Sequence, residues 1–119
     1  MEQFLQKIYT LINHHLTYAK RLRQFLMDGG EFQHRSEREC EFGRLFYGEV
    51  FPQANEFPPE IRDLIVDIER LHREFHQLAC QITETCDEKD LQALYHATDM
   101  LILRLTRLER TIKSQAANG

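Results

Sequence analysis

The middle of the chain decides the fold: residues 71–80 read LHREFHQLAC, and the apolar positions around them recur every three or four residues. This spacing is typical of a helix that buries one face. Counted at about 100° per residue, Ile61, Ile65 and Ala79 fall within about 20° of His72. The stretch therefore predicts a long helix whose buried face carries a histidine, and with it an all-α fold.

The same periodicity predicts three further helices. We expect a first helix from about Phe4 to the Asp28-Gly29-Gly30 stop, followed by a short cysteine-bearing helix with Ser36 as N-cap and Glu39 completing a capping box. A third helix is expected from Pro59 to near Thr85, and a fourth from the cap Asp87 to about Gln115. The segment from Gly48 to Pro59 contains all three prolines and is predicted to be an irregular connection. Three long helices and one short helix indicate an antiparallel four-helix bundle.

Composition limits the class of protein. A chain of 119 residues with 42% apolar and 29% charged residues suits one domain spanning residues 1–119. The net charge of −4 argues against a basic surface that would bind the phosphate backbone of nucleic acid. Residues 1–19 mix polar side chains into their apolar positions, so we expect neither a signal peptide nor a membrane span, and we place the protein in the cytoplasm. Three cysteines in such a chain are predicted to be reduced thiols or metal ligands.

Three of the six histidines are predicted to face inward. On the first helix, His15 lies at the centre of the apolar stripe and His14 at its edge. On the third helix, His72 lies within the apolar face and His76 on its flank. A buried imidazole must satisfy its ring nitrogens, either with a carboxylate or carbonyl or with a metal. The other two histidines are predicted to face solvent: His34 in a loop and His96 about 140° from the apolar stripe of the last helix.

Four inward ligands would satisfy one zinc ion. Residues four apart stack on one face of a helix, so both imidazoles of the pair His72 and His76 can point at one metal, although charged helices also produce this spacing by chance. Zinc prefers four ligands in a tetrahedron. Cys80 would crowd one side and Cys86 lies at a helix end, whereas Cys40 comes from a separate short helix and can close the site from a third direction.

Three strings in order resemble a known family. HLTYAKRL (15–22), CEFGRLFYG (40–48) and LHREFH (71–76) are similar to the motif series of the chemoreceptor zinc-binding (CZB) domain family, and the resemblance spans most of the chain. It implies that one zinc ion per chain is bound by His15, Cys40, His72 and His76. The family usually has tryptophan where this chain has Tyr18 and Leu45. Both keep a bulky apolar body, so the changes affect packing around the site more than ligation.

The resemblance also implies a role. A closed site of three histidines and one cysteine leaves no position for substrate, so we predict no enzyme activity but a structural or sensory role, with zinc released when Cys40 is oxidised or free zinc falls. Family members accompany bacterial chemoreceptors and diguanylate cyclases, which implies input to chemotaxis or cyclic di-GMP signalling through such a partner or output domain. The alternative is a hemerythrin-like di-iron bundle that binds oxygen, which would need more inward ligands. Glu69, the one carboxylate near the histidine face, is predicted to support an imidazole.

The fourth helix carries two further patterns. The run Met100-Leu101-Ile102-Leu103 is apolar all the way round the helix, which predicts either a homodimer interface or a tightly packed central turn. Leu101, Leu105, Leu108 and Ile112 alternate at spacings of four and three. This is the seam of a coiled coil that passes a signal to an output domain, or else ordinary bundle packing.

Overall fold

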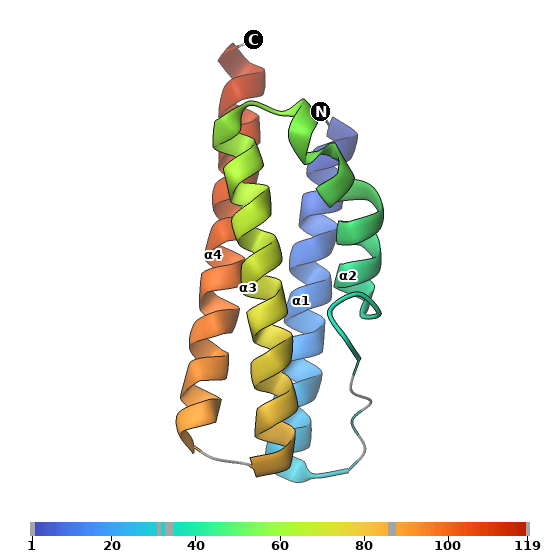
Figure 1. Ribbon diagram of the computed structural model, residues 1–119, viewed down its shortest axis with the longest axis vertical. Helices are drawn as coiled ribbons and strands as arrows, with labels where there is room; N and C mark the ends of the chain where they lie inside the picture. The colour runs from blue at the N-terminus through green and yellow to red at the C-terminus, as the bar shows by residue number, and fades with distance from the viewer. Residues whose placement is uncertain (1, 31, 33–34, 86–87, 119) are drawn as a thin grey trace.

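The helices follow one another as in the predicted bundle. The computed structural model describes residues 2–30, 32, 35–85 and 88–118, and within them it contains helices and no strands (Figure 1). The elements in order are α1 (Glu2–Asp28), α2 (Glu41–Leu45), a π-helical turn η1 (Phe46–Val50), a 3-10 helix η2 (Phe51–Glu56), α3 (Pro59–Thr85) and α4 (Glu88–Asn118). The all-α four-helix prediction is confirmed; the predicted cap Asp87 lies outside the described residues.

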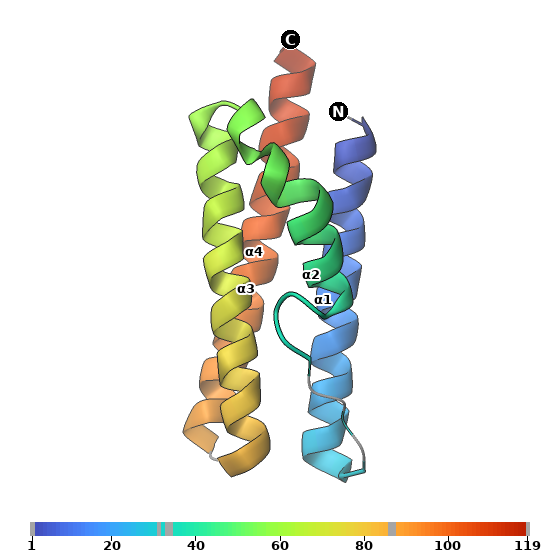
Figure 2. The same cartoon turned by 45° about the vertical axis from the view of Figure 1, so that its right-hand side comes forward.

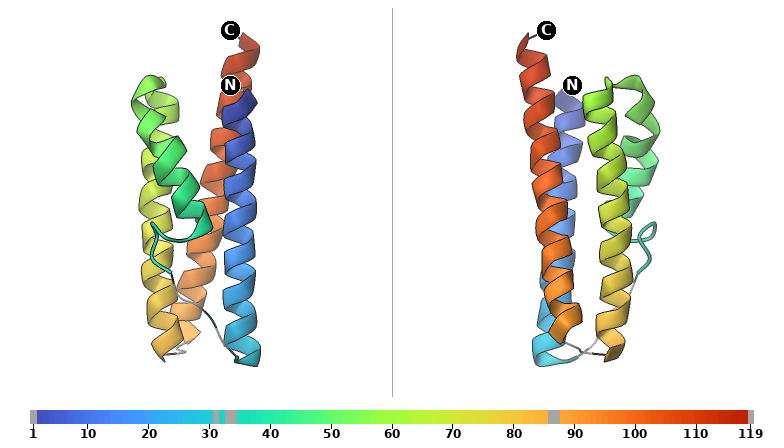
Figure 3. Two further views of the ribbon diagram at one scale, coloured as in Figure 1. Left: turned by 90° about the vertical axis from the view of Figure 1, so that its right-hand side faces the viewer. Right: turned by 60° about the vertical axis from the view of Figure 1, so that its left-hand side comes forward.

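The short helices cross between two of the long ones. Three long helices form a rod with extents of 49 × 23 × 19 Å, in which α4 packs against both α1 and α3. The segment from α2 to η2 starts beside α1 and rises toward the beginning of α3 (Figure 2), and the side views show it covering one face of the rod (Figure 3). The chain therefore places the start of α2 beside α1, and a separate short helix carries the cysteine segment, as predicted.

The first helix ends where glycine is needed. Gly29 and Gly30 have φ values of +78° and +97°, a left-handed conformation that glycine adopts at low cost. The Gly29 N–H donates to the carbonyl of Phe25 at 2.8 Å and closes the last turn. The predicted stop is confirmed.

The predicted cap of the short helix is wrong. Helix α2 begins at Glu41, and its N-cap is Cys40, whose backbone is extended (φ −69°, ψ 162°). Ser36 instead begins one isolated turn, because its carbonyl accepts from the N–H groups of Glu39 and Cys40 while its hydroxyl donates to the Glu39 carboxylate. The capping-box residues do interact, but the chain unwinds at Cys40 before the helix starts.

The predicted irregular connection is mostly helical. After α2 the chain continues through η1 and η2 as far as Glu56. Pro52 lies in the first turn of η2, where its missing N–H leaves no bond unmade. Only the end of the segment, at Phe57 and Pro58, lies outside a helix, and α3 begins at Pro59 as predicted.

Two hydrophobic clusters fill the bundle. The upper cluster takes in the start of α3 and the second half of α4 and includes Phe42 and Phe46. The lower cluster takes in the second half of α3 and the start of α4 and includes Leu22 and Phe75. The candidate coiled-coil seam belongs to the upper cluster, where its four members are fully buried: Leu101, Leu105, Leu108 and Ile112. These residues are therefore bundle core rather than a free seam. No helix in the described part of the chain is long and apolar enough to cross a membrane.

Candidate metal centre

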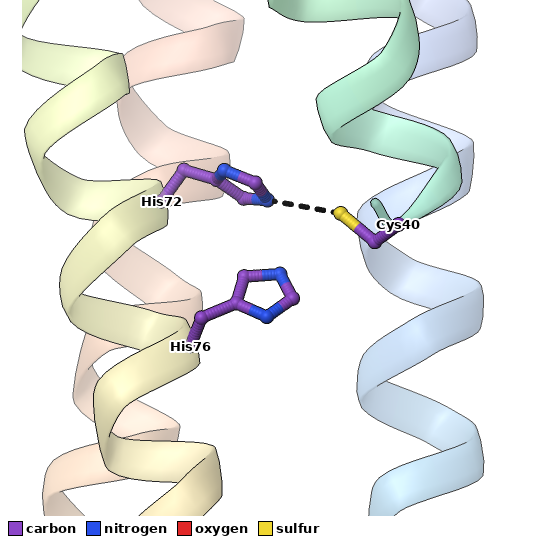
Figure 4. A group of neighbouring side chains, drawn as sticks. All are labelled: Cys40, His72 and His76. Carbon is purple, nitrogen blue, oxygen red and sulfur yellow. Dashed lines mark hydrogen bonds between the residues drawn. The ribbon is translucent and has the colours of Figure 1, made fainter. Parts of the chain in front are cut away.

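Three of the four predicted ligands meet inside the bundle. One possible ligand atom from each of Cys40, His72 and His76 lies within 4.8 Å of the other two, and all three residues are buried. The two histidines project from neighbouring turns of α3 toward the cysteine at the start of α2 (Figure 4). The structure thus brings together three of the four side chains that the sequence singled out.

The distance between Cys40 and His72 fits two ligands of one zinc ion. Zinc–sulfur bonds of about 2.3 Å and zinc–nitrogen bonds of about 2.0 Å, meeting at the tetrahedral angle, place the two ligand atoms about 3.5 Å apart. Cys40 Sγ lies 3.4 Å from His72 Nε2. The donors are one sulfur and imidazole nitrogens, the set that structural zinc sites use.

Backbone groups around α2 hold the cysteine sulfur. The N–H of Gly43 donates to Cys40 Sγ at 3.2 Å, and Sγ lies 3.6 Å from the carbonyl oxygen of Glu37. Burial raises the pKa of the Cys40 thiol, an effect that the Gly43 N–H partly opposes. Without a metal the sulfur is therefore a thiol, and metal binding would displace its proton.

Each α3 histidine is oriented by its neighbours. His76 Nδ1 lies 2.9 Å from the carbonyl oxygen of Arg35, which can accept the ring N–H and leave Nε2 as the ligand atom. The His72 ring stacks on Phe42 with centroids 4.2 Å apart, and this contact turns its Nε2 toward Cys40. The carbonyl of Arg35 gave no signal in the sequence, because a backbone atom has no residue type to detect.

His15 lies beside the cluster but is not one of the three residues that meet. Its side chain is 1% exposed, and its Nε2 is buried without a hydrogen-bond partner. Its ring packs edge-on against Phe75, with centroids 4.6 Å apart. Burial lowers the pKa of His15 to about 3, and the nearby His76 adds to this effect. Burial likewise lowers the pKa of His72 to about 2, with further contributions from His76 and His15. Both rings are therefore neutral at pH 7, the state in which imidazole binds metals.

The remaining predictions for single residues give mixed results. His14 is half-buried and His96 is exposed, as the helical faces predicted, while His34 and Cys86 lie outside the described residues. Glu69 does not support an imidazole: its carboxylate accepts from Tyr47 and pairs with Arg73. The helical angle placed it near the histidine face but could not show a closer partner on η1.

A cavity of about 500 Å³ adjoins the cluster. Its lining includes Cys40, His72 and His76 together with Tyr18 and Arg21 from the second half of α1. Tyr18 stands where the resembled family has tryptophan, and its hydroxyl is buried. Small molecules that enter the cavity therefore come close to the cysteine sulfur.

The described residues contain no second group of ligands of this kind. Across residues 2–30, 32, 35–85 and 88–118, the cluster of Cys40, His72 and His76 is the one set of three histidine, cysteine or carboxylate residues close enough to share an ion. A di-iron centre needs several bridging carboxylates and more histidines. The geometry therefore favours a single metal ion over the hemerythrin-like alternative.

Comparison with known proteins agrees with this centre. Residues 15–83 match the family model of the chemoreceptor zinc-binding domain, and this range includes all four predicted ligands. No curated protein and no solved structure matched the chain. Because the family match covers more than half of the 119 residues, the chain belongs to the chemoreceptor zinc-binding (CZB) domain family.

Proposed function

We propose that this chain is a regulatory domain that binds one zinc ion through His15, Cys40, His72 and His76 and reports zinc or oxidants to a signalling partner. The observation that carries the proposal is the buried convergence of the cysteine and the two α3 histidines within 4.8 Å. The partner is a bacterial chemoreceptor or a diguanylate cyclase, the proteins that the family resemblance implies. The site supplies binding and sensing rather than catalysis, because four protein ligands leave zinc no open position.

His15 is the proposed fourth ligand because its buried nitrogen lacks a partner. An unsatisfied buried polar atom costs about 1–3 kcal/mol, and a ligand bond would remove that cost. His15 is also close enough to His72 and His76 for its charge to be coupled to both. A His15→Ala variant that retained full zinc affinity would leave the three-residue cluster as the whole protein contribution.

Cys40 is the proposed oxidant-sensitive group. Bound zinc would hold its sulfur as a thiolate, the nucleophilic form. Attack of that thiolate on hypochlorous acid gives a sulfenic acid and releases chloride, so the sulfur is oxidised and the chlorine reduced. The sulfur then lacks its negative charge and binds metal weakly. Because Cys40 caps α2, its departure from the cluster would free the start of that helix to move away from α3.

Limited hypochlorous acid is expected to release zinc and to modify Cys40 before Cys80. The adjoining cavity gives small oxidants a route to the Cys40 sulfur, which bound zinc would hold as a thiolate, whereas the exposed Cys80 is not one of the clustered residues. Zinc release would be followed with a chromogenic chelator and the oxidised cysteine mapped by mass spectrometry. A Cys80→Ser variant is the control and should release zinc normally. Zinc release with an unmodified Cys40 would contradict the redox mechanism, whereas the proposal of zinc sensing would stand.

We further propose that two copies associate through the outer groove between α3 and α4. Val66, which lines the groove, is 50% exposed, and Leu103, one helical turn before the groove residue Arg107 on α4, is 55% exposed. The groove also has charge of both signs, with Asp63 on the α3 side and Arg107 on the α4 side. A two-fold axis would place the acidic side of one copy against the basic side of the other, so the surface complements itself.

A Leu103→Glu variant is expected to shift the protein from dimer to monomer, because the new carboxylate would be buried without a partner in the interface. Multi-angle light scattering over a concentration series measures the mass directly. Leu16→Glu is the matched control, since Leu16 is another half-exposed leucine but lies on α1. A wild-type chain that stays monomeric at every concentration would contradict the proposed dimer.

A further inference from the structure

A tyrosine joins the cysteine segment to the histidine helix. Tyr47 lies on η1, seven residues after Cys40, and its hydroxyl donates to Glu69 Oε1 at 3.0 Å. Glu69 lies on α3, three residues before His72, and its side chain is only 14% exposed. One directional bond therefore links the two elements that supply the metal ligands.

The same tyrosine also contacts the chain before the cysteine. The guanidinium carbon of Arg38 lies 4.2 Å from the centre of the Tyr47 ring, a cation–π contact. Arg38 is two residues before Cys40, so the ring holds the segment on both sides of the sulfur. On α3, Arg73 Nη1 lies 3.3 Å from the same Glu69 oxygen and fixes the acceptor. Burial, aided by Glu69, raises the Tyr47 pKa to about 12, so the hydroxyl keeps its proton at neutral pH.

The apolar contacts of this segment do not by themselves fix its rotation. Phe42, Phe46 and Val50 are buried and anchor it in the upper cluster. Hydrophobic contact is not directional, so such an anchor tolerates small rolling motions about the helix axis. A metal site needs its ligands within about 0.5 Å of their working positions. A hydrogen bond to the side of the segment supplies the missing direction.

We infer that Tyr47 is a positioning residue of the metal centre: its bond to Glu69 and its contact with Arg38 hold Cys40 at ligand distance from His72. The inference rests on the proposed zinc function, which it deepens by naming a residue that sets affinity without touching the metal. Tyr47 is not a ligand in this arrangement, since its hydroxyl donates to Glu69.

The test compares two tyrosines with the same surroundings. Tyr9 also places its hydroxyl near a glutamate, 3.4 Å from Glu109 Oε1, and a lysine near its ring, with Lys113 Nζ at 5.5 Å from the centroid. That group joins α1 to α4, away from the cluster. Tyr47→Phe and Tyr9→Phe each remove one hydroxyl and keep the ring, so they differ in location rather than in chemistry.

Tyr47→Phe is expected to weaken zinc binding about tenfold, the lower end of the range for removal of an outer hydrogen-bond partner, and Tyr9→Phe to leave it unchanged. Competition with a chelator measures the affinity. Cobalt substitution gives a second readout, because the thiolate-to-cobalt absorption should change in Tyr47→Phe alone. Glu69→Gln, which keeps an acceptor oxygen, should retain more affinity than Glu69→Ala.

The outcomes separate this inference from the proposed function. If the wild-type chain binds zinc, and Tyr47→Phe matches Tyr9→Phe in both affinity and cobalt spectrum, the positioning role is overturned while the zinc site stands. If the wild-type chain binds no zinc, the proposed function fails and this inference fails with it.

Discussion

A His72→Ala variant is expected to bind zinc at least about a hundredfold more weakly than the wild-type chain. Structural zinc sites bind with about 10–16 kcal/mol, so one of four ligands accounts for about 3 kcal/mol, and each 1.4 kcal/mol is a factor of ten. The loss should be large at this position because His72 is fully buried and its Nε2 lies 3.4 Å from Cys40 Sγ. Cys40→Ala should have an effect of similar size.

Zinc content after purification and chelator competition measure this effect. The wild-type chain should carry about one zinc ion, the number that four ligands satisfy. His96→Ala is the matched control, because His96 is exposed on α4 and is not part of the cluster. His34→Ala, at a position that the sequence predicts to face solvent, should also be neutral. Equal losses for all of these variants would mean that the chain binds zinc without a specific site.

Gly43→Ala is expected to destabilise the protein by about 3 kcal/mol and to lower its melting temperature by about 10 °C. A Cβ at this position would overlap the carbonyl oxygen of Glu37 and come within 2.8 Å of its carbon and 3.1 Å of Arg38 Cα. All three are backbone atoms, so no side chain can move aside. Either the turn at residues 37–39 or the start of α2 must shift, and zinc affinity should fall as well because the Gly43 N–H holds Cys40 Sγ.

Gly48→Ala is the control for this prediction. Gly48 lies in the π-helical turn η1, and a Cβ there would meet no atom within 4 Å. Alanine at such a position reduces the entropy of the unfolded chain and should be neutral or slightly stabilising. Thermal unfolding of both variants, with and without zinc, gives the comparison. A Gly43→Ala chain as stable as Gly48→Ala would show that the close approach at Glu37 relaxes at little cost.

The inward histidines could be predicted because a helix repeats about every 100° and the apolar stripe fixes which face is buried. His15 and His72 lie at the centre of their stripes and are each 1% exposed; His76 on the flank is 5% exposed. The same reasoning correctly predicted that His96 is exposed. The convergence of Cys40 with the α3 pair followed from the need for a ligand from a third direction, and the family motifs agreed with it.

The failures concern interactions that depend on the path of the backbone. The hydroxyl of Ser36 donates to the Glu39 carboxylate, a side-chain bond rather than the side-chain-to-backbone bonds of a capping box, and the turn between them is not continued into α2. The π-helical turn η1 has no sequence period of its own, so the partnership of Tyr47 with Glu69 could not be found by counting residues. The spacing of the apolar residues on α4 could not distinguish a coiled coil from bundle packing, because the same apolar stripe occurs in both.

The position of the candidate metal centre beside both hydrophobic clusters bears on how cooperatively the bundle unfolds. The ring of His15 contacts Phe42 of the upper cluster and Phe75 of the lower one, with centroids 6.2 Å and 4.6 Å away. Regions of one protein can open locally with different free energies, so two clusters that no ion links need not open together. An ion bound at this place would contact residues beside both clusters and would couple their opening into one transition.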